Sequence, residues 1–120
     1  MLLTIGAALP TLWGIAHLFP TKNVADGFGE ISVDKRRILV MEWMIEGFAL
    51  IFIGALIILV TYAWGPADPH TAHIALACVV MLIALAILSL FTGFRVKFLP
   101  FQLCPFIFTA SAVLLVVGVL

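Results

Sequence analysis

The sequence predicts an all-α, polytopic membrane protein in which a single domain, residues 1–120, forms a bundle of four transmembrane helices. The first observation is composition: 65% of the residues are hydrophobic, 10% are charged, and the mean hydropathy is +1.31. A soluble domain of this size cannot bury so large an apolar fraction. The second observation is spacing. Four apolar stretches of about 20 residues, the length that crosses a bilayer as a helix, follow one another at 2–19, 38–62, 71–94 and 101–120.

The first span, residues 2–19, lacks the features of a cleaved signal peptide. No basic residue precedes its apolar run, and no small-x-small cleavage site follows it. We therefore expect this span to be retained as a membrane helix. His17 lies close to its end, and the polar connection that follows contains Lys22, Asp26 and Glu30. An imidazole is thus placed at the membrane boundary.

The second span, residues 38–62, is expected to continue a helix that starts outside the bilayer. Ser32 suits the N-cap position, because its hydroxyl can accept an amide of the first turn. A helix from Val33 to Thr61 would be about 43 Å long at about 1.5 Å per residue, whereas the hydrocarbon core is about 30 Å thick. The excess length places the basic first turn among the lipid headgroups: Lys35, Arg36 and Arg37.

Glu42 and Glu46 are the only ionisable residues between Ile38 and Val60. Because they are four residues apart, they share one face of the helix. A carboxylate facing lipid costs several kcal/mol, so each is expected to be protonated, paired, or turned toward the bundle interior or a wet cavity. Such acids mark functional sites by default. The alternative is that Glu42 reaches the interface beside the arginines and Glu46 only hydrogen-bonds a neighbouring helix.

The third and fourth spans follow short polar connections. Asp68 and Pro69 form an N-cap and N1 pair ahead of the third span, residues 71–94. Gln102 lies in the first turn of the fourth span, residues 101–120. Asp68 and Pro69 therefore predict where the third helix begins.

Small side chains predict how the helices pack. Gly47 and Gly54, seven residues apart on the second span, lie on one helix face and allow a neighbouring backbone to approach closely. Cys78 and Cys104 lie in apolar segments and belong to no CxxC motif, so we expect both to be small buried residues.

The basic residues predict the orientation of the bundle. With four spans, the first and third connections lie on one side of the membrane, and both termini lie on the other. All six basic residues are on the side of the first and third connections: Lys22, Lys35, Arg36, Arg37, Arg95 and Lys97. The positive-inside rule then places these connections in the cytoplasm and both termini outside it. We expect a multi-pass protein of a bacterial inner membrane.

Polar side chains from all four spans are expected at one depth, near the cytoplasmic leaflet. We predict that they form an inward-facing site for binding a ligand or handling protons: His17, Glu42, Glu46, Arg95 and Gln102. An imidazole beside a carboxylate titrates near neutrality and can hold or pass a proton. The sequence assigns no residue a catalytic role. The structural alternative is a hydrogen-bond network that fixes the register of the bundle.

A metal centre is a weaker alternative in two places. His17, Glu42 and Glu46 offer nitrogen and oxygen ligands that suit zinc, iron or manganese. However, di-metal sites in helix bundles usually contain a Glu-x-x-His pair, which is absent here. The second place is the start of the third span, where three further ligands lie near one another: Asp68, His70 and His73. A metal site is therefore not the leading prediction, and the sequence specifies no cofactor.

Function is predicted only in outline. The leading hypothesis is a small integral membrane protein that acts as a binding or accessory subunit, with the lipid bilayer, a second copy or a larger membrane complex, and a small amphiphile as partners. One alternative is a membrane-embedded redox or metal-dependent enzyme component, and another is an oligomeric proton or ion pathway. The formal net charge of zero gives no indication of nucleic-acid binding. In architecture the protein resembles small four-helix bacterial membrane proteins such as the DoxX-like group, but architecture does not imply an activity.

Overall fold

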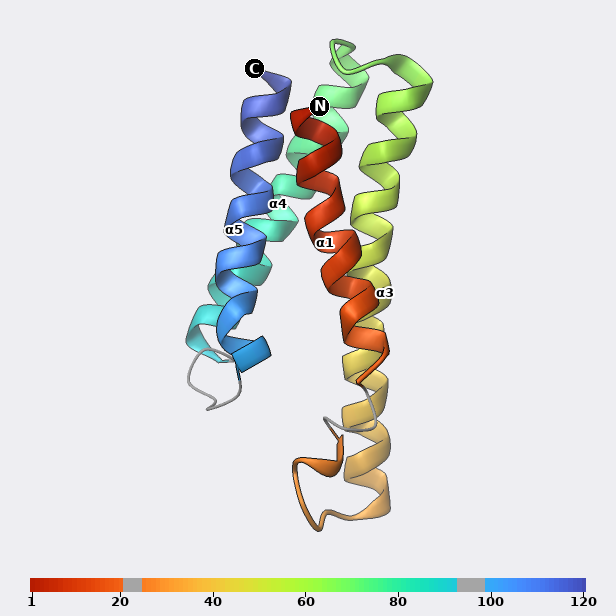
Figure 1. Ribbon diagram of the computed structural model, residues 1–120, viewed down its shortest axis with the longest axis vertical. Coiled ribbons are helices and arrows are strands. Elements are labelled where there is room, and N and C mark those ends of the chain that lie inside the picture. The colour runs from red at the N-terminus through yellow and green to blue at the C-terminus, as the bar shows by residue number, and fades with distance from the viewer. Residues whose placement is uncertain (21–24, 93–98) are drawn as a thin grey trace.

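The computed structural model describes residues 1–20, 25–92 and 99–120, and it confirms the all-α fold. The chain folds into four helices, α1 (Leu2–Leu18), α3 (Val33–Trp64), α4 (Pro69–Phe91) and α5 (Leu99–Val119), with no strand in the described part. The two termini and the α3–α4 connection lie at one end of the molecule, and the C-terminal end of α1 and the N-terminal end of α3 lie toward the opposite end (Figure 1). This up-and-down order is the one expected for four successive spans.

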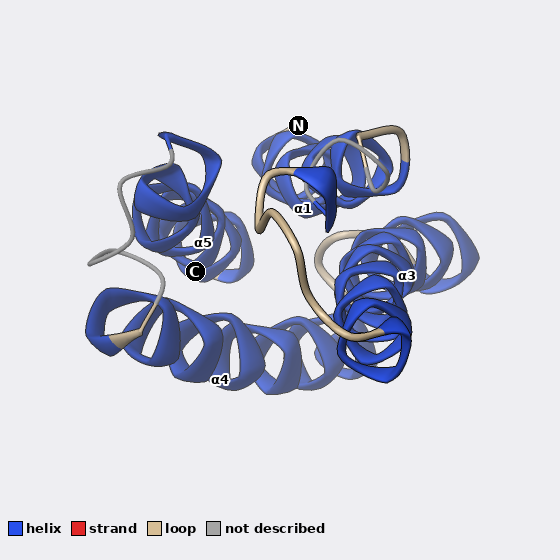
Figure 2. Cartoon of the chain, turned by 90° about the horizontal axis from the view of Figure 1, so that it is seen from below, coloured by secondary structure: helices blue, strands red, loops and turns tan. Residues whose placement is uncertain are grey.

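The four helices form a ring in the order α1, α3, α4, α5, and neighbouring helices meet along four seams. Three of these seams are closely packed and one is sparse. α1 packs most extensively on α3, and α4 on α5, while α1 and α5 join these pairs. α3 and α4 share the sparsest of the four seams. Seen along the bundle, α4 runs away from α3 toward α5 (Figure 2). The bundle is therefore loosest between α3 and α4.

Within the described residues, three helices are long and apolar enough to cross a membrane: α3, α4, and α5 from Gln102 onward. α1 is a shorter apolar helix of 17 residues. Many large apolar side chains are exposed, including Phe48, Phe52 and Phe106. Apolar side chains exposed on this scale are not tolerated on a soluble monomer and suit contact with lipid. The fold is therefore that of a multi-pass membrane protein.

Most of the interior is apolar. Its most deeply buried side chains come from α1, α3, α4 and α5: Leu3, Leu50, Ile57, Leu82, Phe108 and Leu115. Two buried hydroxyls are satisfied by backbone carbonyls of neighbouring helices. Ser111 donates to the carbonyl of Gly6 at 2.6 Å, and Thr71 donates to that of Val60 at 3.2 Å. The core therefore carries few polar groups that need solvation.

The long helix α3 begins and ends where its sequence indicates. The Ser32 hydroxyl accepts the amide of Lys35 at 3.2 Å, so Ser32 is the N-cap, as predicted. The helix runs three residues beyond the predicted Thr61 and stops at Gly65, whose φ of 90° favours glycine. Arg36 in the first turn is paired with Asp26 of the preceding connection at 2.6 Å. This contact ties that connection to the basic end of α3.

Glycines allow α1 and α3 to approach closely, and this confirms the packing role predicted for Gly47 and Gly54. A Cβ added at Gly14 would lie 2.5 Å from the carbonyl oxygen of Gly47. One added at Gly54 would lie 2.5 Å from the carbonyl oxygen of Ala7 and would overlap the hydroxyl of Thr11. The two backbones are thus in contact, which is typical of small-residue interfaces in membrane bundles. This interface fixes α1, and with it His17, against α3.

The N-cap of α4 leads to a prediction about pH. The Asp68 carboxylate accepts the backbone N–H of His70 at 2.8 Å, and this hydrogen bond holds the pKa of Asp68 below its usual value. The stabilisation of α4 should therefore be constant above about pH 4, where aspartate is ionised even in an unfolded chain, and be lost as the pH falls through the lowered pKa. Asp68→Asn keeps a capping side chain that does not titrate, so its stability should not fall in this range. Thermal unfolding in detergent at several pH values measures both proteins, and an equal acid sensitivity in Asp68→Asn would contradict the assignment.

Candidate functional site

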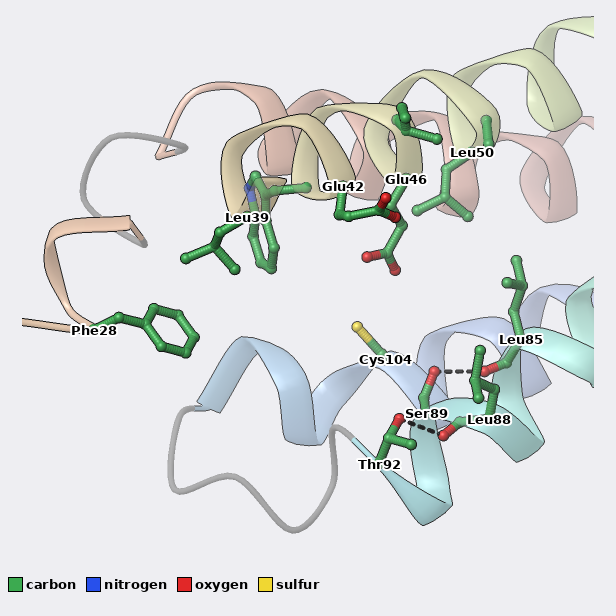
Figure 3. A pocket seen from close by; sticks show the side chains of 13 residues that line it. Phe28, Leu39, Glu42, Glu46, Leu50, Leu85, Leu88, Ser89, Thr92 and Cys104 are labelled. Atoms are coloured by element: carbon green, nitrogen blue, oxygen red, sulfur yellow. Dashed lines mark hydrogen bonds between the residues drawn. The ribbon is translucent and has the colours of Figure 1, made fainter. Parts of the chain in front are cut away.

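A cavity of about 610 Å³ lies between α3 on one side and α4 and α5 on the other, in the half of the bundle away from the termini (Figure 3). At this end of the bundle α4 lies away from α3 (Figure 1), and these two helices share the sparsest of the four seams. Most of its described lining is apolar: Phe28, Leu39, Trp43, Ile45, Ala49, Leu50, Leu85 and Leu88. Its polar lining comes from Glu42, Glu46, Ser89, Thr92 and Cys104. The cavity is therefore a largely apolar space with polar groups gathered on its walls.

His17 is buried behind this cavity at the C-terminal end of α1, with 3% of its surface exposed. Its Nδ1 lies 2.9 Å from the carbonyl oxygen of Trp13. Because a carbonyl only accepts, Nδ1 must carry the proton and donate it. The ring stacks on Trp43, with centroids 4.4 Å apart, and meets Trp13 edge-on at 5.6 Å. Two indoles and a hydrogen bond thus fix the orientation of the imidazole.

Glu46 faces this imidazole. Its Oε2 lies 3.7 Å from Nε2 of His17, and its side chain is 34% exposed because it also lines the cavity. Trp43, three residues earlier on α3, stacks on the imidazole and donates its indole N–H to the carbonyl of His17. One turn of α3 therefore supplies both the carboxylate and the ring that position His17. The sequence predicted that His17 and Glu46 lie in one site, and the structure places them next to each other.

Cys104 completes this group from α5. Its Sγ accepts the indole N–H of Trp13 at 3.3 Å, and the residue is 5% exposed. One possible ligand atom from each of His17, Glu46 and Cys104 lies within 4.8 Å of the other two. In Figure 3 the sulfur of Cys104 points across the cavity toward the carboxylates on α3. Three helices therefore bring a nitrogen, an oxygen and a sulfur to one point.

The remaining predicted residues lie in different places. Glu42 is exposed and lines the same cavity one turn before Glu46, with both carboxylates projecting toward α4 and α5 (Figure 3). Gln102 is half-buried, and among the described lining residues α5 contributes Cys104 rather than Gln102. Arg95 lies outside the described residues. Of the predicted site residues, Glu42 and Glu46 line the cavity and form its acidic wall.

The residues that the sequence reasoning missed are Trp13, Trp43 and Cys104. Trp13 precedes His17 by four residues, a spacing that places both on one helix face, and this signal was available. Cys104 lies near the start of its span, at the depth predicted for the site, but depth alone does not give the direction in which a helix faces. The place of Cys104 beside His17 and Glu46 could therefore be read only from the packing of α5.

The second set of predicted metal ligands, Asp68, His70 and His73, lies at the opposite end of the bundle and does not converge on one point. The Asp68 carboxylate lies 2.9 Å from Nδ1 of His70, while His73 is exposed. Within the described ranges, the ligand atoms of three or more such residues converge only at His17, Glu46 and Cys104. Asp68 and His70 act together as a helix cap.

The hydroxyls on the α4 wall are oriented by their own helix. Ser89 donates to the carbonyl of Leu85 at 2.5 Å, and Thr92 donates to that of Leu88 at 2.6 Å (Figure 3). Their protons are used in these bonds, so each oxygen offers lone pairs to a molecule in the cavity. An ionised carboxylate likewise only accepts. No residue among those described as lining the cavity is basic, so these groups favour hydrogen-bond donors and positive charge.

Together the fold and the cavity define a multi-pass α-helical membrane bundle with a largely apolar cavity that carries a few polar groups. Comparisons with protein-family models, with curated proteins and with solved structures find no match.

Proposed function

We propose that this protein binds a small amphiphile that enters from the bilayer, with its apolar body in the cavity and a hydrogen-bond-donating head between the two polar walls. The observation that carries this proposal is the lining of the cavity: apolar side chains form most of it, and Glu42, Glu46, Ser89 and Thr92 offer acceptors on opposite sides. Binding sites for small molecules commonly combine an apolar surface with a few placed polar groups. An amine or a hydroxyl head fits these acceptors.

The route into the cavity supports a ligand taken from lipid. We infer that the ligand enters between α3 and α4, because both helices line the cavity and share the least packing, and because their lining side chains include the apolar Leu39, Ile45 and Leu88. A ligand with an acyl or isoprenoid chain can keep that chain in an apolar medium throughout its entry. Phe28, half-exposed on the first connection, lies at the headgroup end of the cavity (Figure 3).

The orientation follows from the basic first turn of α3. Because Lys35, Arg36 and Arg37 lie at the same end of the bundle as the cavity, the positive-inside rule places the cavity in the cytoplasmic leaflet and the termini outside the cytoplasm. In a bacterium this is the inner membrane. A role as a subunit of a larger complex, or as a homo-oligomer, remains a prediction beside this proposal.

Filling the cavity should abolish ligand binding. Ala49 lines the cavity, whereas Ala55, on the same helix, is exposed and is not among the described lining residues. Ala49→Trp should therefore lower the affinity for an amphiphile at least about tenfold, a loss of about 1.4 kcal/mol, and Ala55→Trp should leave it unchanged. Binding is measured in detergent by quenching of tryptophan fluorescence with a brominated alkylamine, alkanol or alkyl phosphate of one chain length.

The second test compares the affinities for the three brominated ligands, which differ only in their head groups. The amine and the alkanol should bind more tightly than the phosphate, because the described lining offers acceptors rather than donors. Glu42→Gln, which replaces an exposed carboxylate with a neutral amide, should lower the affinity for the amine more than the affinity for the alkanol. Equal binding to wild type and Ala49→Trp, or preference for the phosphate, would overturn the proposal.

A further inference from the structure

We propose that His17, Glu46 and Cys104 bind a divalent first-row metal ion, with zinc(II) as the representative ion. Nδ1 or Nε2 of His17, a carboxylate oxygen of Glu46 and Sγ of Cys104 lie within 4.8 Å of one another, and the three residues come from α1, α3 and α5. This inference concerns a second occupant of the site and goes beyond the binding of an amphiphile.

The spacing of the three atoms is close to that of a tetrahedral site. Zinc binds nitrogen and oxygen at about 2.0–2.2 Å and thiolate sulfur at about 2.3 Å, which sets neighbouring ligand atoms roughly 3.3–3.8 Å apart. Nε2 of His17 and Oε2 of Glu46 are already 3.7 Å apart. From the 4.8 Å limit, the sulfur of Cys104 has to approach the other two atoms by at most about 1–1.5 Å, a distance on the scale of a side-chain rotation.

Hydrogen bonds around the group orient two of the three ligands. Metal-binding histidines usually donate their second ring N–H to a carbonyl or carboxylate, which fixes the tautomer and directs the other nitrogen at the metal. Here the Nδ1–H of His17 is donated to the carbonyl of Trp13, and Nε2 faces Glu46. The indole N–H of the same Trp13 is donated to the sulfur of Cys104. One tryptophan therefore positions both the imidazole and the thiol.

Charge balance favours a divalent ion in this place. A carboxylate and a thiolate carry one negative charge each, so a divalent ion makes the group neutral. Neutralisation removes the cost of holding Glu46 within the apolar half of the bundle. The mixed donor set also limits the choice of metal. Carboxylate oxygen and imidazole suit zinc, whereas copper(I) selects thiolate and thioether ligands.

The fourth position of such a site faces the cavity, because Glu46 and Cys104 both line it. Three protein ligands and one open position are the arrangement of catalytic zinc sites, in which water or a substrate oxygen occupies the fourth position. A bound ion would thus present a Lewis acid at the inner wall of the cavity. Glu42, Ser89 and Thr92 remain available for the head of an amphiphile.

Cobalt(II) titration of the purified protein tests the site without reference to any amphiphile. The wild type should bind one equivalent, with a thiolate-to-cobalt charge-transfer band in the near ultraviolet, and excess zinc should remove the band. Cys78→Ser, which alters the other buried cysteine, should retain the band, and Cys104→Ser should lose it. Trp13→Phe removes the hydrogen bond to the sulfur while keeping an aromatic ring beside His17, and it should weaken binding roughly 10–100-fold.

A measurement on the wild-type protein tests the site even if the variants do not fold. Zinc should slow alkylation of Cys104 at least about tenfold and leave alkylation of Cys78 unchanged, as read by peptide mass spectrometry, since the metal ligand is the thiolate that would otherwise react. A charge-transfer band that persists in Cys104→Ser, or equal alkylation of Cys104 with and without zinc, would overturn the proposal. Amphiphile binding in Ala49→Trp and the cobalt band are separate readouts, so either proposal can fail alone.

Discussion

Gly54→Ala should destabilise the bundle, although the same exchange stabilises most helices. Alanine is favoured over glycine in a helix by about 1 kcal/mol, so an open position would gain stability. At Gly54 the added methyl group would lie 2.5 Å from the carbonyl oxygen of Ala7 and would overlap the hydroxyl of Thr11. Forcing atoms into a closed interface costs about 1–3 kcal/mol. We therefore expect a net loss, measured as a lower midpoint of unfolding in a denaturing detergent mixture.

Two further substitutions serve as controls for the Gly54→Ala prediction. Gly118→Ala adds the same methyl group where the nearest atoms, all from Leu3, are 3.1 Å away, so its effect should be smaller. Ala55→Val adds apolar volume on an exposed position of α3 and should change the midpoint little. A Gly54→Ala protein that is as stable as the wild type, or more stable, would show that α1 and α3 are not in backbone contact.

The fold was largely readable from the sequence because bilayer thickness, hydropathy and capping act locally. Four apolar stretches near 20 residues gave the four helices, and Ser32 and Asp68 gave two helix starts that the structure confirms. The ends were less exact. The spans predicted as 2–19 and 101–120 are helices at Leu2–Leu18 and Leu99–Val119, while the second helix extends to Trp64. Such ends depend on the last turn and its neighbours, which local patterns describe poorly.

The candidate site was readable only in part, because it depends on how the helices rotate about their axes. The depth of His17 and Glu46 follows from counting residues, and a lipid-facing carboxylate is costly enough to predict that Glu46 turns inward. The partner from α5 does not follow from depth. Gln102 was selected because it is polar, yet Cys104, two residues later and classed as apolar, faces the cavity. A rotation of α5 distinguishes these two residues, and only packing determines it.

His17→Ala should produce a large loss of stability, centred on the end of α1 that lies next to the cavity. The imidazole makes one hydrogen bond to Trp13, a stacked contact with Trp43 and a close approach to Glu46. Aromatic contacts contribute about 0.5–1.5 kcal/mol each and a hydrogen bond a similar amount, so we expect a loss of roughly 3 kcal/mol with the space left behind included. His73→Ala, at an exposed histidine of α4, is the matched control and should leave stability unchanged.

The same variant also distinguishes the role of Glu46. If Glu46 is held in place by His17, the stability lost in His17→Ala and in Glu46→Gln should be less than additive when the two are combined, because both remove the one contact at 3.7 Å. Unfolding of the wild type, the two single variants and the double variant, each in the same detergent mixture, gives the coupling energy. Strictly additive losses would mean that the imidazole and the carboxylate act independently. The indoles of Trp13 and Trp43 would then be sufficient to position the imidazole, and Glu46 would belong to the cavity alone.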